Sequence, residues 1–186
     1  MIGRAARIGV ATVSAVAAVA LVAAVTAGAN GVPRPRASSA VTAARNATRA
    51  FHNLQRGENA GYGFFTDKKG IACIAMQGMG GMGVHFVNST QVGNAAERVR
   101  TPEALVYRVD SHGKLVLSAL EYVVLKSAWD ATHHARPRLF GHTFNLTPAG
   151  NRYGLPAFYS LHAWVWYTNP AGMFAMWNPD VSCANA

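Results

Sequence analysis

The chain has little charge, few acidic side chains and very little cysteine. Only 13% of its 186 residues are charged whereas 51% are hydrophobic, which excludes an intrinsically disordered composition. Lysines and arginines number 17 against 8 acids, so the formal net charge is +9. The basic residues are scattered, and no ladder of stacking aromatic residues accompanies them. We therefore expect no nucleic-acid partner, although a weak attraction to an anionic cell envelope is physically reasonable.

The signatures of the familiar enzyme classes are also missing. The sequence contains no GxSxG nucleophile elbow, no P-loop and no HExxH motif. Residues 78–83 do spell GxGxxG, but residues 84–88, VHFVN, favour a strand where dinucleotide binding requires a helix. A dinucleotide-binding domain is therefore not expected, and whether the protein is an enzyme stays open.

The first 29 residues have the pattern of a signal peptide. Arg4 and Arg7 carry charge without any acid, residues 8–29 form an uncharged run made mostly of alanine and valine, and residues 27–29, AGA, fit a small-residue cleavage site. The run is long enough to span a bilayer, but alanine buries little apolar area, so removal is favoured over anchoring. The sequence predicts a bacterial protein that is secreted or held in the cell envelope.

Cys73 and Cys183 are the only two cysteines. In an exported chain they meet an oxidising compartment, so we expect a disulfide between them. The bond would close a loop of about 110 residues and would stabilise the fold by roughly 4 to 5 kcal/mol in the chain-entropy model. Two thiolate metal ligands are the less favoured alternative, because neither cysteine lies in a CxxC motif.

One domain is predicted beyond the signal. Residues 30–40 form a linker rich in proline, serine and arginine, and residues 41–186 form a single domain. Apolar residues recur at helical spacing from Val41 to Leu54, and Gly57 follows as a stop signal, which predicts one amphipathic helix. The strand candidates that follow are residues 71–76, 84–88, 104–109, 114–125, 139–144 and 157–167.

No second helical pattern alternates with these strand candidates, which argues against a parallel sheet. The predicted fold is α+β, with the N-terminal helix packed on a curved antiparallel sheet or a partly open β-barrel, and with one disulfide. A closed, lipocalin-like barrel is the alternative. Either arrangement supplies a pocket.

Residues 77–88, QGMGGMGVHFVN, combine glycines with side chains that could bind a metal. Glycines that can adopt positive φ are expected where a ligand or a second backbone approaches closely. Met82 and His85 lie among them and could offer a soft sulfur and an imidazole. The alternative is that Met82 fills the core and His85 is a hydrogen-bonded core histidine.

The two longest strand candidates each place a polar side chain among apolar ones. On one face of residues 114–125, Glu121 alternates with Leu115, Leu117, Ala119 and Val123. On one face of residues 157–167, His162 alternates with Ser160, Trp164 and Trp166. A buried carboxylate needs a partner, so Glu121 is expected to be buried and paired.

These residues lead to three hypotheses about function. In the first, His85, Glu121 and His162 converge on one copper or zinc ion, with His142 or Met82 in support. In the second, a small molecule binds in an aromatic pocket whose wall is formed by Phe86, Tyr122, Trp164 and Trp166. The third is a metal-dependent enzyme, which would need an open coordination position. A structural Glu–His hydrogen bond without any metal accounts for the same polar residues.

Several segments together resemble one family of uncharacterised exported bacterial proteins. The segments are GGMGVHFVN, PEALVY, LEYVV, LFGHTF and YSLHAWVWYTNPAGMFAMWNPDVSC, which span roughly residues 42–183. The family's pattern is a GMGxH box followed by a closing LHxWxWxxNPxGxFxxWNPxVxC motif. The resemblance implies an exported protein with a single domain, and it implies no mechanism.

Overall fold

The computed structural model describes residues 39–184 and residue 186. They belong to one compact unit, Pro35–Ala186. The predicted signal peptide, residues 1–29, and all but the last two residues of the predicted linker lie outside the described residues. Within the described part of the chain, no helix is both long and apolar enough to cross a membrane.

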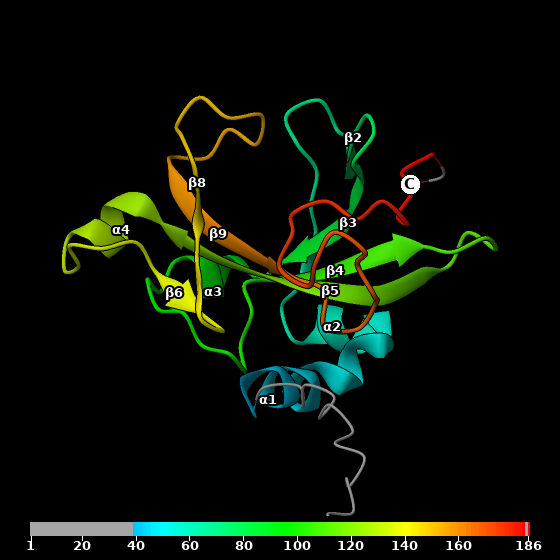
Figure 1. The fold of residues 1–186 in the computed structure, drawn as a ribbon, viewed down its shortest axis with the longest axis horizontal. Helices are drawn as coiled ribbons and strands as arrows, with labels where there is room; N and C mark the ends of the chain where they lie inside the picture. Colours follow the sequence, from blue (N-terminus) through cyan, green and yellow to red (C-terminus); the bar gives the residue numbers. More distant parts are fainter. Residues whose placement is uncertain (1–38, 185) are drawn as a thin grey trace, which may run out of the picture. The chain divides into compact units, whose positions relative to one another are not determined.

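An antiparallel sheet of seven strands forms the centre of this unit (Figure 1). Six strands follow one another in the order β1-β3-β4-β5-β9-β8, and β2 pairs with β3 outside this path. Their bounds are β1 Gly63–Phe64, β2 Cys73–Met76, β3 Gly80–Val87, β4 Ala104–Val109, β5 Leu115–Leu125, β8 Asn145–Thr147 and β9 Phe158–Ala163. Among the described residues the sheet is not closed, so the α+β class is confirmed and the closed-barrel alternative is wrong.

Three short helices on one face of the sheet replace the single helix that the periodicity predicts (Figure 1). They are α1 Ser39–Thr48, the 3₁₀-helix η1 Arg49–His52 and α2 Leu54–Asn59. The break falls at Asn53, whose backbone is extended and whose side chain accepts a hydrogen bond from the Arg56 amide, as an N-cap does. Gly57 is not a stop signal, because it lies buried inside α2 against Leu105.

The helices and the sheet enclose the main hydrophobic core. Buried apolar side chains come from α1 and from four strands, and include Val41, Ala44, Phe86, Leu105, Tyr107, Leu117, Tyr122 and Leu161. The buried phenols are satisfied, since Tyr107 donates to the carbonyl of Phe51 at 2.7 Å and Tyr122 donates to that of Val99 at 2.9 Å. This face of the sheet is therefore filled, whereas the opposite face is covered by loops (Figure 1).

Two predicted strands are shorter than the sequence pattern suggests. Residues 139–144 form a small hairpin, β6 Arg138–Leu139 with β7 His142–Thr143, because Phe140 and Gly141 both turn the chain at positive φ. β9 ends at Ala163, so the tryptophans after it belong to a loop. The predicted hairpin turn at residues 110–113 is confirmed by the hydrogen bond from the Gly113 amide to the Asp110 carbonyl.

The strand β5 contains a bulge at Ser118. Its register against β4 shifts there, because Val106 pairs with Ala119 whereas the next residue, Tyr107, pairs with Leu117. One extra residue reverses the alternation of side chains, so the residues before and after Ser118 change faces. Leu115 and Leu117 therefore pack in the helix-side core, whereas Ala119, Glu121 and Val123 face the other side. The single five-residue face predicted for this strand is wrong for this reason.

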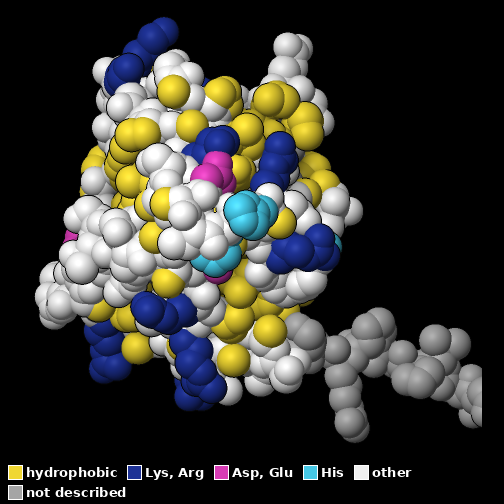
Figure 2. Space-filling model, turned by 90° about the vertical axis from the view of Figure 1, so that its left-hand side faces the viewer, with side chains coloured by type: hydrophobic (Ala, Val, Ile, Leu, Met, Phe, Trp, Pro, Cys, Tyr) yellow, Lys and Arg dark blue, Asp and Glu magenta, His cyan; other side chains and the backbone are white. Residues whose placement is uncertain are grey.

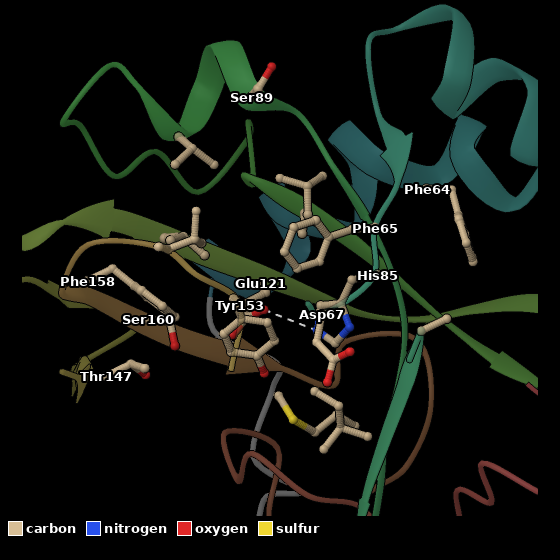
Figure 3. Close-up of a pocket in the computed structure, with 18 of the residues that line it drawn as sticks. Phe64, Phe65, Asp67, His85, Ser89, Glu121, Thr147, Tyr153, Phe158 and Ser160 are labelled. Atoms are coloured by element: carbon tan, nitrogen blue, oxygen red, sulfur yellow. Dashed lines mark ion pairs between the residues drawn. The ribbon is translucent and has the colours of Figure 1, made fainter. Parts of the chain in front are cut away.

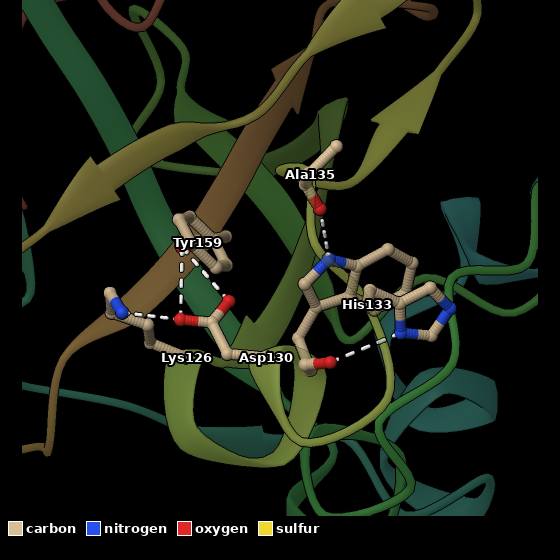
Figure 4. A network of polar contacts seen from close by, with 6 residues as sticks. Lys126, Asp130, His133, Ala135 and Tyr159 are labelled. Carbon is tan, nitrogen blue, oxygen red and sulfur yellow. Dashed lines mark hydrogen bonds and ion pairs between the residues drawn. The ribbon is translucent and has the colours of Figure 1, made fainter.

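Two short helices flank the sheet, α3 Ser89–Val92 and α4 Lys126–Asp130. At α4, Asp130 pairs with Lys126 and accepts a hydrogen bond from the hydroxyl of Tyr159 at 3.1 Å (Figure 4). His133 stacks on Trp129 with ring centroids 3.6 Å apart. These contacts join α4 to β9 and fix the end of β5 against its neighbour.

The C-terminal segment is tied to β3 and β2 at two points. Cys73 and Cys183 form a disulfide, which confirms the predicted bond. Asn178 exchanges two backbone hydrogen bonds with Gly81, at 3.2 and 3.0 Å. Its side-chain amide donates to the carbonyl of Thr168, and the residue is fully buried. The segment that follows β9 is therefore a fixed part of the fold.

This segment explains two of the glycines in residues 77–88. A Cβ added to Gly80, whose φ is +84°, would lie 1.9 Å from the carbonyl oxygen of Asn178. A Cβ on Gly81 would lie 2.9 Å from the sulfur of Cys183. The close approach expected from the sequence is thus made by a second backbone of the same chain.

We predict that Gly80→Ala is much more destabilising than Gly78→Ala. Both residues have positive φ, so both variants lose about 1 kcal/mol of folding free energy from backbone strain. Only Gly80 also meets Asn178, because nothing lies within 4 Å of a Cβ at Gly78. Urea unfolding of the oxidised proteins should place Gly80→Ala at least about 2 kcal/mol below Gly78→Ala. Equal losses would show that the C-terminal segment does not pack here.

Candidate metal centre

Three neighbouring parts of the sheet each place one polar side chain on the loop-covered face. His85 comes from β3, Glu121 from β5 and His162 from β9. Figure 3 shows His85 and Glu121, joined by a dashed line. Glu121 and His162 are direct partners in the β5–β9 register. Side chains of directly opposed residues lie on the same face of a sheet, so the strand register alone brings Glu121 and His162 together.

His85 reaches Glu121 across the intervening strand β4. Neighbouring strands lie about 4.8 Å apart, so the backbones of β3 and β5 are separated by roughly 10 Å. On this face β4 carries Ala104, which pairs with Glu121, and Val106, which pairs with His85. Because these side chains are small, Nε2 of His85 can lie 3.1 Å from Oε2 of Glu121.

The three side chains form a compact and buried group. Their relative exposures are 8% for His85, 9% for Glu121 and 2% for His162. One potential ligand atom from each lies within 4.8 Å of the others, and the two imidazole centroids are 5.7 Å apart. The prediction that Glu121 is buried and paired is confirmed. Both histidines lie close enough to reach one ion, as expected, but His162 does not itself line the adjoining cavity.

The hydrogen bonds of His85 determine the state of its ring. Its Nδ1 lies 3.2 Å from the carbonyl oxygen of Gly83, which can only accept, so Nδ1 carries the proton. Nε2 of a neutral ring is then an acceptor that faces a carboxylate, another acceptor. The Nε2–Glu121 contact also lacks the alignment of a hydrogen bond. A cation between the two groups would satisfy both.

Both ring nitrogens of His162 are buried and lack a hydrogen-bond partner among the described residues. Its ring lies 4.8 Å from that of Trp164, which offers no polar atom through its face. A neutral imidazole has one donor and one acceptor, and leaving a buried polar group unsatisfied costs about 1 to 3 kcal/mol. The nitrogens of this ring are therefore available to a partner other than the described residues.

The electrostatics favour the protonation states that metal ligands require. Burial opposes ionisation of Glu121, but its close contact with the His85 ring, with smaller contributions from the neighbouring His162 and the hydroxyl of Ser160, lowers its pKa to about 2. Burial lowers the pKa of His162 to about 4, and the negative charge of Glu121 opposes this only in part. Near neutral pH, Glu121 is thus a carboxylate and His162 a neutral imidazole.

A cavity of about 350 Å³ adjoins the group, with His85, Glu121 and Ser160 among its lining residues (Figure 3). Most of its wall is apolar and includes Phe65, Ile74, Val87, Val123, Leu155 and Phe158. Tyr153 lies between Phe65 and Phe158, with ring centroids 5.9 and 6.1 Å away. Burial and the charges of Glu121 and Asp67 raise the pKa of Tyr153 to about 12, so its hydroxyl remains a donor.

The other predicted ligands have different positions. Met82 is buried and lines this cavity, as does Met176, which the sequence interpretation missed. His142 is exposed on β7, where its ring lies 4.1 Å from that of Phe174, and it does not belong to the group. The turn between β6 and β7 directs His142 away from β5 and β9. The single strand predicted for residues 139–144 would contain no such turn.

None of the four aromatic residues predicted as the pocket wall lines the cavity. Phe86 and Tyr122 point from β3 and β5 to the helix-side core. Each directly follows a residue of the His85–Glu121–His162 group along its strand, so its side chain lies on the opposite face. Trp164 and Trp166 lie beyond the end of β9 and line a separate hollow with Arg45. The aromatic part of the wall is instead formed by Phe64, Phe65, Tyr153 and Phe158. Of these residues only Phe158, on β9, could have been found from the sequence. It lies an even number of residues from His162 and therefore on the same face of the strand.

Comparison with models of known protein families, with characterised proteins and with solved structures found no match to any of them.

We predict that metal-free protein loses stability as pH falls from about 6.5 to about 4, and that His162 causes the loss. Its pKa is depressed in the folded state, so the unfolded chain takes up the proton first. The expected loss is on the order of 3 kcal/mol, since one pKa unit corresponds to about 1.36 kcal/mol. Urea unfolding in the presence of a chelator should show this slope in wild type and in the exposed-turn variant His112→Asn.

The slope should be absent from His162→Phe, which keeps a ring but cannot titrate. Loss of the Glu121 contribution comes at lower pH, between about 4.3 and about 2, because that carboxyl has a depressed pKa. The two effects are therefore separable. An unchanged slope in His162→Phe would mean that His162 is not buried as a neutral ring.

Proposed function

We propose that this protein binds one zinc or copper ion through His85, Glu121 and His162. The observation that carries the proposal is the set of buried imidazole nitrogens, Nε2 of His85 and both nitrogens of His162, that have no hydrogen-bond partner among the described residues. Protein interiors rarely leave such atoms unsatisfied. A metal ion bound by all three side chains gives a partner to one nitrogen of each ring and to the carboxylate.

The contact of the His85 ring with the backbone carbonyl of Gly83 supports this proposal. Metal-binding histidines usually donate their other ring N–H to a carbonyl or carboxylate, which fixes the tautomer and orients the ring. His85 makes such a contact to Gly83 through Nδ1. Ligand atoms that each lie about 2.1 Å from a tetrahedral zinc ion are about 3.4 Å apart. The widest pair, within 4.8 Å, therefore needs to close by up to about 1.4 Å when the ion binds.

Zinc is the preferred ion, and copper is the second candidate. Two imidazoles and one carboxylate are a ligand set that zinc uses, with the fourth position left for water or a substrate. Copper(I) prefers soft sulfur, and the thioethers of Met82 and Met176 line the same cavity. The open position and the adjoining cavity also favour a metal-dependent enzyme or a ligand-binding module as the wider role.

A purely structural Glu–His hydrogen bond is a weaker explanation. It would involve His85 and Glu121 only, and their contact is not aligned as a hydrogen bond. It would leave both nitrogens of His162 without partners. The metal accounts for all three residues, whereas the hydrogen bond accounts for two.

We also propose that the protein is exported and acts outside the cytoplasm. A disulfide is typical of proteins in oxidising compartments, and the chain has one between Cys73 and Cys183. The proposal includes no nucleic-acid partner, because the lysine and arginine side chains on the face in Figure 2 form separate small groups and no continuous basic patch. Membership of the family with the GMGxH box belongs to the same proposal.

We expect purified wild-type protein to bind about one equivalent of zinc, and His85→Ala and His162→Ala to weaken zinc binding at least about 100-fold. His142→Ala is the matched control, since it removes an imidazole outside the group and should bind zinc as wild type does. Elemental analysis after dialysis and competition with a chromophoric chelator measure both quantities.

The same measurements are made with copper. Wild-type protein that binds neither ion would contradict the proposal. Full retention of metal by both His85→Ala and His162→Ala would show that the ion binds elsewhere. Weaker metal binding by His142→Ala would show that His142 is a ligand after all.

A further inference from the structure

The cavity beside the metal group combines an apolar wall, a polar end and a basic rim. Its volume is about 350 Å³, at the lower end of the range for small-molecule sites. The polar end contains His85, Glu121 and Ser160. Phe64 and Ile71, which also line it, are 62% and 41% exposed, so the cavity reaches the protein surface.

The rim carries positive charge on two loops. Arg152 precedes the lining residue Tyr153 and pairs with Asp67, which also lines the cavity. That carboxylate is fully engaged, because it further accepts the amides of Lys69 and Ile71 at 2.8 and 2.9 Å. The amide of Lys68 donates to the carbonyl of Arg152, which holds the two loops together. Lys68 and Lys69 are exposed, and no ion pair is recorded for either within the described residues.

The charge at the polar end depends on the metal. Without an ion, the Glu121 carboxylate repels anions. With a divalent ion bound by Glu121 and two neutral imidazoles, the local charge is +1, which one monoanion neutralises. The open coordination position is the natural place for that anion.

We propose that the cavity binds a small amphiphilic monocarboxylate, whose carboxylate takes the open position of the metal and whose apolar chain or ring lies along the wall. This inference rests on the metal site proposed above. Phe65, Val87, Val123 and Phe158 contact the apolar part, and the Tyr153 hydroxyl is placed to donate to a carboxylate oxygen. Lys68 and Lys69 steer the anion toward the mouth.

The test compares three probes that differ only in the head group: octanoate, 1-octanol and octylammonium. Calorimetric titration into zinc-loaded wild type should show octanoate binding at least about tenfold more tightly than either of the others, a difference of about 1.4 kcal/mol. Removal of zinc should abolish this preference, because the free carboxylate of Glu121 then repels the probe. Equal binding of the three probes to the zinc form, or a preference that survives metal removal, would overturn the inference.

Two phenylalanine substitutions test where the apolar part lies. Val87→Phe fills the cavity and should weaken octanoate binding at least about tenfold, whereas Leu146→Phe, at an exposed residue that does not line the cavity, should bind octanoate as wild type does. Both should keep one equivalent of zinc, which also shows that they are folded. Octanoate binding to zinc-loaded Val87→Phe as tight as to wild type would overturn the inference.

If Val87→Phe does not retain zinc, a chain-length series on wild type decides instead. Affinity should rise about three- to fourfold for each methylene from butanoate upward until the cavity is full. A flat series would place the chain outside the cavity and overturn the inference. Absence of zinc from wild type, seen before any probe is added, is the separate outcome that removes the proposed function as well.

Discussion

The bulge at Ser118 is the constraint on which the site depends. In a regular strand, Leu117 and Glu121 would point to the same face. Leu117 is needed in the core beneath the helices, and Glu121 is needed on the opposite face with the two histidines. One extra residue between them meets both needs. The loop after β9 supports this arrangement, because the amides of Trp166 and Tyr167 both donate to the carbonyl of Ser118.

The same bulge explains what could and could not be predicted from the sequence. Strand β4 was predicted with its observed bounds, and His85 and His162 lie close together, as was expected from the glycine-rich segment and from the strand that carries His162. Glu121 was assigned correctly because it lies beyond the bulge with Ala119 and Val123. Leu115 and Leu117 lie before it, and the change of register at Ser118 leaves no signal in hydrophobic alternation. Bulges are tertiary features, since pairing with β4 and β9 defines them.

The remaining errors arose from local chain geometry. The predicted N-terminal helix is interrupted at Asn53, because the side chain of an asparagine can cap the start of a new helix as easily as it can face solvent. His142 lies outside the site because Phe140 adopts a positive φ and turns the chain just before it. A positive φ is uncommon for a bulky residue, and no feature of the sequence indicates it. The aromatic wall could not be found by periodicity, since Phe65 and Tyr153 lie in loops. Their position depends on the ion pair between Asp67 and Arg152, 85 residues apart.

The glycines of β3 connect the stability of the fold to the order of the site. Gly81 receives the backbone of Asn178, and two residues later the carbonyl of Gly83 accepts from the His85 ring. Gly83 has φ +89°, and a Cβ there would lie 2.8 Å from a side-chain carbon of Val106 on β4. The backbone that orients His85 is thus held by β4 on one side and by the disulfide-linked C-terminal segment on the other. A metal ligand needs such support, because a ring free to rotate would bind an ion with a larger loss of entropy. The segment that follows β9 therefore serves the site without contributing a histidine to it.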